Sequence, residues 1–188
     1  MSLIHLKKRG AVVVAIRLTD GCVKMQLPNG KVVDILTAVL DEISNWLQDN
    51  FDKPESGGYI IGYQHKDTGN IVLESVSVPQ KLDKKTRIRF DIKDPFHNLF
   101  LRRAQRNKSY YMGVWHTHPQ DIPVPSSIDL EDWKQTLVVD KTGSEYIFFI
   151  IAGTVGTRVW VGNKIENSII EIEECKKTDG LYESVNPQ

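Results

Sequence analysis

The feature that most restricts the fold of this chain is a polar cluster near its middle. It reads His116-Thr117-His118-Pro119, then, after six more residues, Ser126-Ser127-Ile128-Asp129. Successive side chains of a β-strand point to opposite faces, so His116 and His118 share one face with Cα atoms about 6.6 Å apart. Two imidazoles at that spacing can converge on one ion, about 2.0–2.1 Å from each nitrogen. The cluster therefore predicts a strand that ends beside a helix N-terminus, where Asp129 is a third ligand.

Two histidines and one carboxylate leave a fourth tetrahedral position open, which is typical of a catalytic zinc site. Imidazole and carboxylate ligands in a four-coordinate site favour zinc over iron or manganese, and we expect one ion per chain. A water molecule on the ion needs a general acid/base, and Glu55 is the candidate. It precedes Gly57 and Gly58, which allow close backbone approach. Ser126 is the candidate hydrogen-bond donor to the oxyanion.

Each of these residues also has an ordinary structural interpretation. Ser126 and Asp129 by themselves form a helix capping box. A single histidine on a strand is most often a polar or core residue, and Glu55 alone would be a solvated turn residue. The combination at this spacing favours the metal centre, and a capping role does not exclude Asp129 as a ligand.

The rest of the chain mixes strands and helices, which indicates one α+β domain whose sheet is covered by helices on at least one face. The catalytic domain is expected to span 1–175, followed by a polar, flexible tail over 176–188. Expected strands lie at 11–18, Cys22–Leu27, Tyr59–Tyr63, Ile71–Val78, Tyr110–His116, Tyr146–Ala152 and Thr157–Val161, expected helices at about Ile35–Leu47, Pro95–Asn107 and Ser126–Leu137, and a strand or short helix at 164–173.

Composition excludes several classes of protein. The chain has 24 basic and 24 acidic residues, and a net charge of zero argues against a nucleic-acid or membrane binder. Its longest apolar run, Tyr146–Ala152, is far shorter than the roughly 20 residues that span a bilayer. Arg17 and Asp20 interrupt the N-terminal apolar stretch before it could serve as a signal peptide. Cys22 and Cys175 form no disulfide framework, so we expect a cytoplasmic protein.

The polar cluster and the upstream glutamate resemble the motif of the JAB/MPN metallopeptidase family, also called JAMM. Its pattern is a Glu followed by His-x-His-Pro-x₆-Ser-x₂-Asp, and the chain matches every position. The resemblance implies a curved mixed sheet flanked by helices, similar to the cytidine-deaminase arrangement. It also implies that His116, His118 and Asp129 bind zinc, that Glu55 is the general acid/base, and that Ser126 stabilises the tetrahedral intermediate.

The flanking residues Glu55–Gly62, Tyr111–Pro119 and Pro125–Trp133 are similar to a prokaryotic subgroup that accompanies the CD-NTases of bacterial antiphage (CBASS) operons. This implies a deubiquitinase-like isopeptidase or endopeptidase that acts on the C-terminal tail of a nucleotidyltransferase, conjugated by a ubiquitin-transfer-like enzyme. Val114 stands where the subgroup has an acidic residue. Two alternatives stay open: a peptidase for another ubiquitin-like or sulfur-carrier protein, and a non-catalytic scaffold. Scaffolds of this fold usually lack a metal-site residue, whereas this chain keeps them all.

A basic stretch covers residues 81–108. Ten lysines and arginines face only three aspartates there, so the segment is strongly positive in an otherwise neutral chain. A solvated face is the ordinary interpretation. The functional alternative is a docking surface for the tail or an acidic patch of the protein substrate. A nucleic-acid surface is disfavoured because stacking aromatic residues are not interleaved with the cations.

Overall fold

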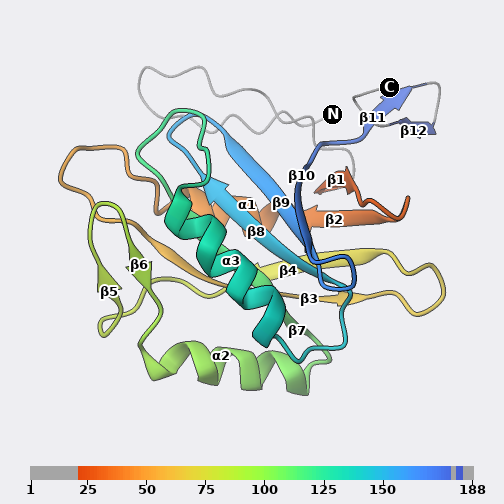
Figure 1. Cartoon of the computed structure of the whole chain (residues 1–188), viewed down its shortest axis with the longest axis horizontal. Coiled ribbons are helices and arrows are strands. Elements are labelled where there is room, and N and C mark those ends of the chain that lie inside the picture. The colour runs from red at the N-terminus through yellow and green to blue at the C-terminus, as the bar shows by residue number, and fades with distance from the viewer. Residues whose placement is uncertain (1–20, 179–180, 184–188) are drawn as a thin grey trace.

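A computed structural model describes residues 21–178 and 181–183, and it contains a curved eight-stranded mixed sheet (Figure 1). The strand order is β1-β2-β4-β3-β7-β8-β9-β10. The strands are β1 Cys22–Gln26, β2 Val32–Leu36, β3 Gly57–Gln64, β4 Ile71–Val76, β7 Tyr110–Thr117, β8 Tyr146–Ala152, β9 Thr157–Asn163 and β10 Ser168–Ile172. The pairs β2–β4 and β7–β8 are parallel and the others antiparallel.

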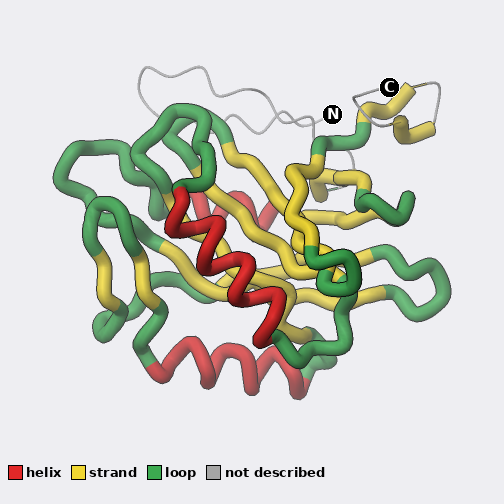
Figure 2. The backbone as a smooth tube through the Cα atoms, viewed as in Figure 1, coloured by secondary structure: helices red, strands yellow, loops and turns green. Residues whose placement is uncertain are grey.

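Helices cover both faces of this sheet. They are α1 Thr37–Ser44, α2 Pro95–Arg106 and α3 Ser127–Val139. In Figure 2, α2 and α3 lie on the near side of the sheet and α1 lies behind it. Two short antiparallel pairs complete the described part: β5 Lys84–Lys85 with β6 Phe90–Asp91, and β11 Lys176–Thr178 with β12 Leu181–Glu183. The predicted α+β class is confirmed; the strand expected at 11–18 lies outside the described residues.

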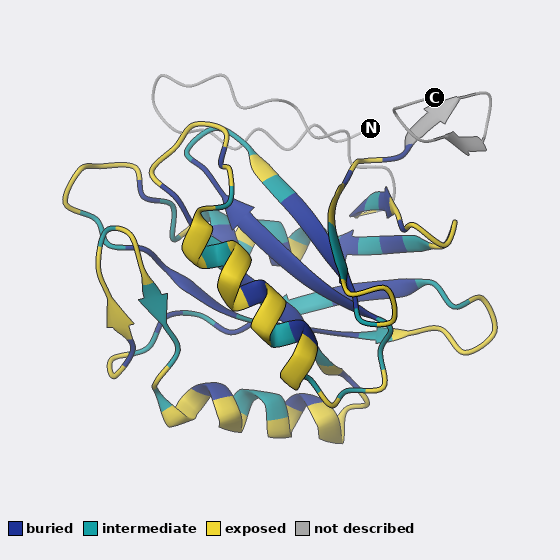
Figure 3. Cartoon of the chain, viewed as in Figure 1, coloured by how far each residue is buried: buried dark blue, intermediate teal, exposed yellow. Residues whose placement is uncertain are grey.

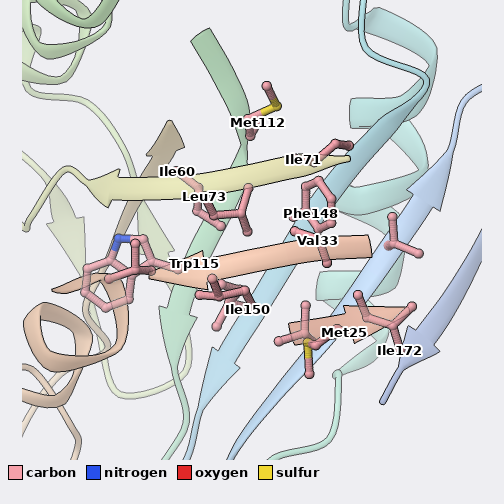
Figure 4. Packing of buried hydrophobic residues seen from close by; sticks show 14 of the residues in the cluster. Met25, Val33, Ile60, Ile71, Leu73, Met112, Trp115, Phe148, Ile150 and Ile172 are labelled. Carbon is pink, nitrogen blue, oxygen red and sulfur yellow. The ribbon is translucent and has the colours of Figure 1, made fainter. Parts of the chain in front are cut away.

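The core has two layers because the central strand β8 is buried on both faces (Figure 3). A run of seven apolar residues, Tyr146–Ala152, is typical of such a strand. On the α1 side, Phe148 and Ile150 belong to the same hydrophobic cluster as Trp115, and Phe148 lies beside Val33 (Figure 4). On the other side, Phe149 stacks on Trp133 of α3 with ring centroids 4.5 Å apart. These two packed layers fix β7 and α3, the elements that carry the polar cluster.

The first helix is shorter than predicted. Helical spacing from Ile35 indicated a helix over Ile35–Leu47, but Ile35 and Leu36 complete β2, where they pair with Val23 and Cys22. The alternating burial of β2 outweighs the helical period at this junction. The start of α2 is as predicted: Asp94 caps the helix by accepting from the Phe96 N–H at 2.9 Å.

The undecided segment 164–173 contains the strand β10. Cys22 and Cys175 are buried and form no disulfide bond. No helix within residues 21–178 and 181–183 is both long and apolar enough to cross a membrane.

Candidate metal centre

The two histidines of the polar cluster lie at the end of β7. This strand is held between β3 and β8, and His116 pairs with Gly57 on one side and Ile151 on the other. His118 continues the line, with its N–H donating to the Ala152 carbonyl at 2.9 Å. The alternation of the strand places both rings on one face, as predicted, and their Nε2 atoms are 3.1 Å apart.

Asp129 reaches the same point from the first turn of α3. The capping box is present: Ser126 Oγ accepts from the Asp129 N–H at 3.2 Å, and Asp129 Oδ2 accepts from the Ser126 N–H at 2.6 Å. The same carboxylate faces the histidines, with Oδ1 3.1 Å from His116 Nε2 and Oδ2 3.4 Å from His118 Nε2. Capping orients the carboxylate toward the histidines, so the structural role does not exclude a ligand role.

The separations of these donor atoms fit a tetrahedral ion. Ligands at 2.0–2.1 Å from a tetrahedral metal lie about 3.3–3.4 Å from one another. The two Nε2 atoms are 3.1 Å apart, and Asp129 approaches them through different oxygens, at 3.1 and 3.4 Å; with one ligand atom from each residue, the three atoms lie within 4.8 Å of one another. Gln120 Oε1 lies 3.4 Å from His118 Nδ1. A proton on that nitrogen leaves the Nε2 lone pair available to a metal. His116, His118 and Asp129 could thus hold one ion, and they offer it three donors.

Glu55 lies at the edge of this donor set. Its Oε1 is 3.7 Å from His118 Nε2, and the residue is 5% exposed. Burial raises the pKa of its carboxyl to about 8, although the nearby His118 favours the charged form. Its position depends on close backbone packing, because a Cβ on Gly57 would lie 2.7 Å from the Trp115 carbonyl and one on Gly58 2.0 Å from the Ser77 carbonyl. The predicted role of the two glycines is confirmed.

The histidines and the carboxylate of the cluster influence each other's protonation. Burial would raise the pKa of Asp129, but hydrogen bonds with His116 and His118 hold it well below its usual value. Burial would lower the pKa of His118, but the Asp129 carboxylate raises it overall. The carboxylate is therefore ionised at neutral pH, which is the form that coordinates a cation.

Sequence reasoning missed Gln48, whose side chain ties the site together. It is 2% exposed. Its Nε2 donates to the carbonyls of Lys53 and Arg87 at 3.2 and 3.0 Å, and its Oε1 accepts from Thr117 Oγ1 at 3.3 Å. Thr117 Oγ1 in turn accepts from the Ser56 N–H at 3.0 Å. One amide thus joins the loop that carries Glu55, the β5–β6 hairpin and the residue between the two histidines.

No local sequence signal marks Gln48, because it lies in a polar loop after α1 and its partners are as many as 69 positions away. The hairpin supports the glutamate a second time: the Glu55 N–H donates to the Thr86 carbonyl at 2.8 Å. The loop before β3 and the hairpin are therefore one hydrogen-bonded unit beside the donor set.

Replacing Gln48 with methionine should disturb catalysis without removing a ligand. The variant leaves buried polar groups unpaired, at a cost of about 1–3 kcal/mol each, so thermal unfolding should occur at lower temperature. A displaced Glu55 should lower kcat by about 10–100-fold, with metal content unchanged. Gln135→Met on the exposed face of α3 is the control. An unchanged kcat in folded Gln48→Met would show that this amide does not position the site.

The structure is a small α+β domain in which His116, His118 and Asp129 form a group that could hold a metal ion. Residues 36–163 match the family described as prokaryotic homologs of the JAB domain, and the chain belongs to this family.

Three relatives carry the name CD-NTase/cGAS isopeptidase. The protein of Escherichia coli (strain TW11681) is 29% identical over 76% of this chain and 88% of its own. The protein of Vibrio cholerae serotype O1 is 29% identical over 75% of this chain and 86% of its own. The protein of Pseudomonas aeruginosa (strain BWHPSA011 / Pa011) is 28% identical over 57% of this chain and 68% of its own.

Proposed function

We propose that this protein is a cytoplasmic, zinc-dependent isopeptidase of antiviral defence. Its substrate is a nucleotidyltransferase whose C-terminal tail has been joined to an amine by a ubiquitin-transfer-like enzyme. The observation that carries the proposal is the convergence of His116, His118 and Asp129 within 3.4 Å of one another, with Glu55 3.7 Å from one of the donors. The names of the three relatives support the substrate class.

The chain supplies the groups that amide hydrolysis requires. A zinc ion held by the three donors would act as a Lewis acid and lower the pKa of a water molecule. Glu55 takes a proton from the attacking water and delivers it to the leaving nitrogen as the C–N bond breaks, which yields a carboxylate and an amine. Its raised pKa suits a group that must both accept and donate a proton at neutral pH.

We assign to Ser126 the role of stabilising the oxyanion. Its oxygen accepts from the Asp129 N–H, which leaves the hydroxyl proton available to a developing negative charge. The residue is exposed, so a substrate can reach it. The edges of the main sheet, β1 and β10, lie at least three strands from β7. An extended tail would therefore add a strand to the β5–β6 hairpin beside the donor set, so that backbone hydrogen bonds align the scissile carbonyl.

Ser126→Ala should separate the two roles of this serine. Loss of the cap should lower the free energy of unfolding by about 1 kcal/mol, and loss of the oxyanion donor should lower kcat by about 10²–10³-fold. Metal content should not change. Ser127→Ala, one residue further along α3, is the control. A variant that unfolds more easily but keeps its full kcat would leave Ser126 with the capping role alone.

The proposed function is tested with purified, zinc-loaded protein and a nucleotidyltransferase joined through its C-terminal carboxyl to a lysine side chain. Release of the intact nucleotidyltransferase, followed by mass spectrometry, is expected. Matched conjugates of a ubiquitin-like protein and of a sulfur-carrier protein test the alternative substrates. Faster cleavage of one of these conjugates would identify that protein, in place of the nucleotidyltransferase, as the substrate. No cleavage of any conjugate would favour a non-catalytic scaffold.

A further inference from the structure

The basic stretch of residues 81–108 is divided between two places in the fold. Its first half forms the β5–β6 hairpin beside the metal centre, where Arg89 pairs with Asp91 at 2.8 Å and reaches Asp132 at 3.8 Å. Arg87 lies over the Phe51 ring, 3.8 Å from its centroid. The second half of the basic stretch is α2, which lies along the lower side of the molecule in Figure 1. In the hairpin, Arg87 and Arg89 thus have partners, whereas among the described residues no ion pair reaches the exposed Lys84 and Lys85. Helix α2 is the part in which a cation lies at a cavity.

The arginines of α2 are exposed and lack a counter-charge. Helix α2 contains no acidic residue, and of the nearest aspartates Asp94 caps it while Asp83 is buried against His97 at 2.8 Å. Within residues 21–178 and 181–183, no ion pair reaches the three exposed arginines of α2, Arg102, Arg103 and Arg106. They form an unneutralised positive surface next to the partly exposed Phe96 and Leu99.

A cavity of about 670 Å³, lined by Arg102 but not by the other two arginines, opens between α2, the start of β7 and the loop after α3. Its walls include Leu101, Arg102, Tyr110, Tyr111 and Met112 together with residues 142–144. Cavities of roughly 300–1,000 Å³ with mainly apolar walls accept a ligand group or a large side chain. The cavity lies at the end of β7 opposite to the histidines, about 13–20 Å from His116 along the strand, so it is separate from the metal centre.

We propose that α2 and this cavity form a docking surface for an acidic patch on the folded body of the conjugated protein. Carboxylates of that patch pair with Arg102, Arg103 and Arg106, and one large apolar side chain enters the cavity. The inference rests on the proposed function, because it assigns a binding surface to the folded body of the substrate whose tail enters the metal centre. Arginine suits such a surface because its guanidinium pairs with carboxylates through two hydrogen bonds.

The shape of the surface favours a protein over a membrane. A helix that lies on a bilayer needs a continuous free apolar face. Helix α2 instead buries His97 and Ala104 in its own domain, half-buries Phe100 and Leu101, and exposes only Phe96 and Leu99 among its large apolar residues. A hollow next to the cations also suits a protruding side chain better than a flat lipid surface. An acidic protein surface is therefore the partner that charge and shape both fit.

The test compares two substrates with the same scissile bond: the whole nucleotidyltransferase conjugate, and a peptide of its tail carrying the same linkage. In the Arg102→Glu/Arg103→Glu/Arg106→Glu variant, KM for the conjugate should rise about tenfold or more at low salt, with kcat unchanged. KM for the peptide should not change. The matched control is Lys31→Glu/Lys66→Glu/Lys134→Glu, which makes the same charge change at exposed lysines elsewhere.

Binding is measured separately by fluorescence anisotropy of the labelled conjugate on Glu55→Gln protein, so docking is tested even if no conjugate is cleaved. Because cations also stabilise the last turn of a helix, the three glutamine substitutions serve as a milder second set, and thermal unfolding is followed for each. Equal affinity and KM in wild type and folded triple variants would overturn the docking surface. So would charge-dependent binding only to phosphatidylserine vesicles or to single-stranded RNA.

Discussion

Replacing Glu55 with glutamine is expected to lower kcat by about 10²–10⁴-fold, the contribution of a positioned general acid/base. Glutamine has almost the same size and can occupy the same buried site, but it cannot accept the proton of the attacking water. Glu55 is not one of the three donors, His116, His118 and Asp129, whose ligand atoms lie within 4.8 Å of one another. Zinc content should therefore stay at the wild-type level, so the variant separates proton transfer from metal binding.

The matched control is Glu131→Gln, which makes the same chemical change at an exposed position on α3 and should leave kcat unchanged. Metal content and thermal unfolding are measured on the same preparations. Wild-type turnover by Glu55→Gln would contradict the assignment of the acid/base. Loss of zinc from this variant would instead make Glu55 a ligand.

Replacing Asp129 with asparagine should remove both metal and activity. The substitution takes away the negative charge that faces both histidines at 3.1 and 3.4 Å. Zinc affinity should fall by at least about 100-fold, because a direct ligand contributes more than the 10–100-fold typical of outer-shell partners. The asparagine oxygen can still accept from the Ser126 N–H, so α3 should remain capped. Competition with a chelator of known affinity measures the loss.

Asp132→Asn is the control for this change, because Asp132 lies on the same helix and reaches only Arg89, at 3.8 Å. It should bind zinc like the wild type. If Asp129→Asn keeps the zinc affinity of the wild type, Asp129 only caps α3, and a different residue must be the third ligand of the ion.

The residues of the polar cluster were predictable from the sequence because short-range geometry decides their placement. Strand alternation places His116 and His118 on one face, and a capping box orients Asp129 toward them. The buried strand β8 and the cap of α2 were predictable for the same reason, since each depends on neighbouring residues. The convergence of Glu55 on this cluster is a long-range event, and only the adjacent Gly57 and Gly58 and the family resemblance indicated it.

Features that depend on distant partners could not be predicted. Gln48 gains its role from Thr117 and from Arg87 on the hairpin, and nothing in its own neighbourhood indicates this. The predicted first helix began too early, because Ile35 fits a helical period. Ile35 is in fact part of β2, and its pairing with Val23 depends on the preceding strand β1. The division of the basic stretch between hairpin and α2 likewise became visible only in three dimensions.

The measurement that tests the central claim most directly is elemental analysis of the untagged wild-type protein. The geometry of His116, His118 and Asp129 predicts about one zinc ion per chain, and zinc should be the metal that restores activity after a chelator has removed it. A protein that holds no zinc, even after zinc is supplied, would contradict the account. The three side chains would then be a hydrogen-bonded cap at the start of α3, and the domain would be a scaffold.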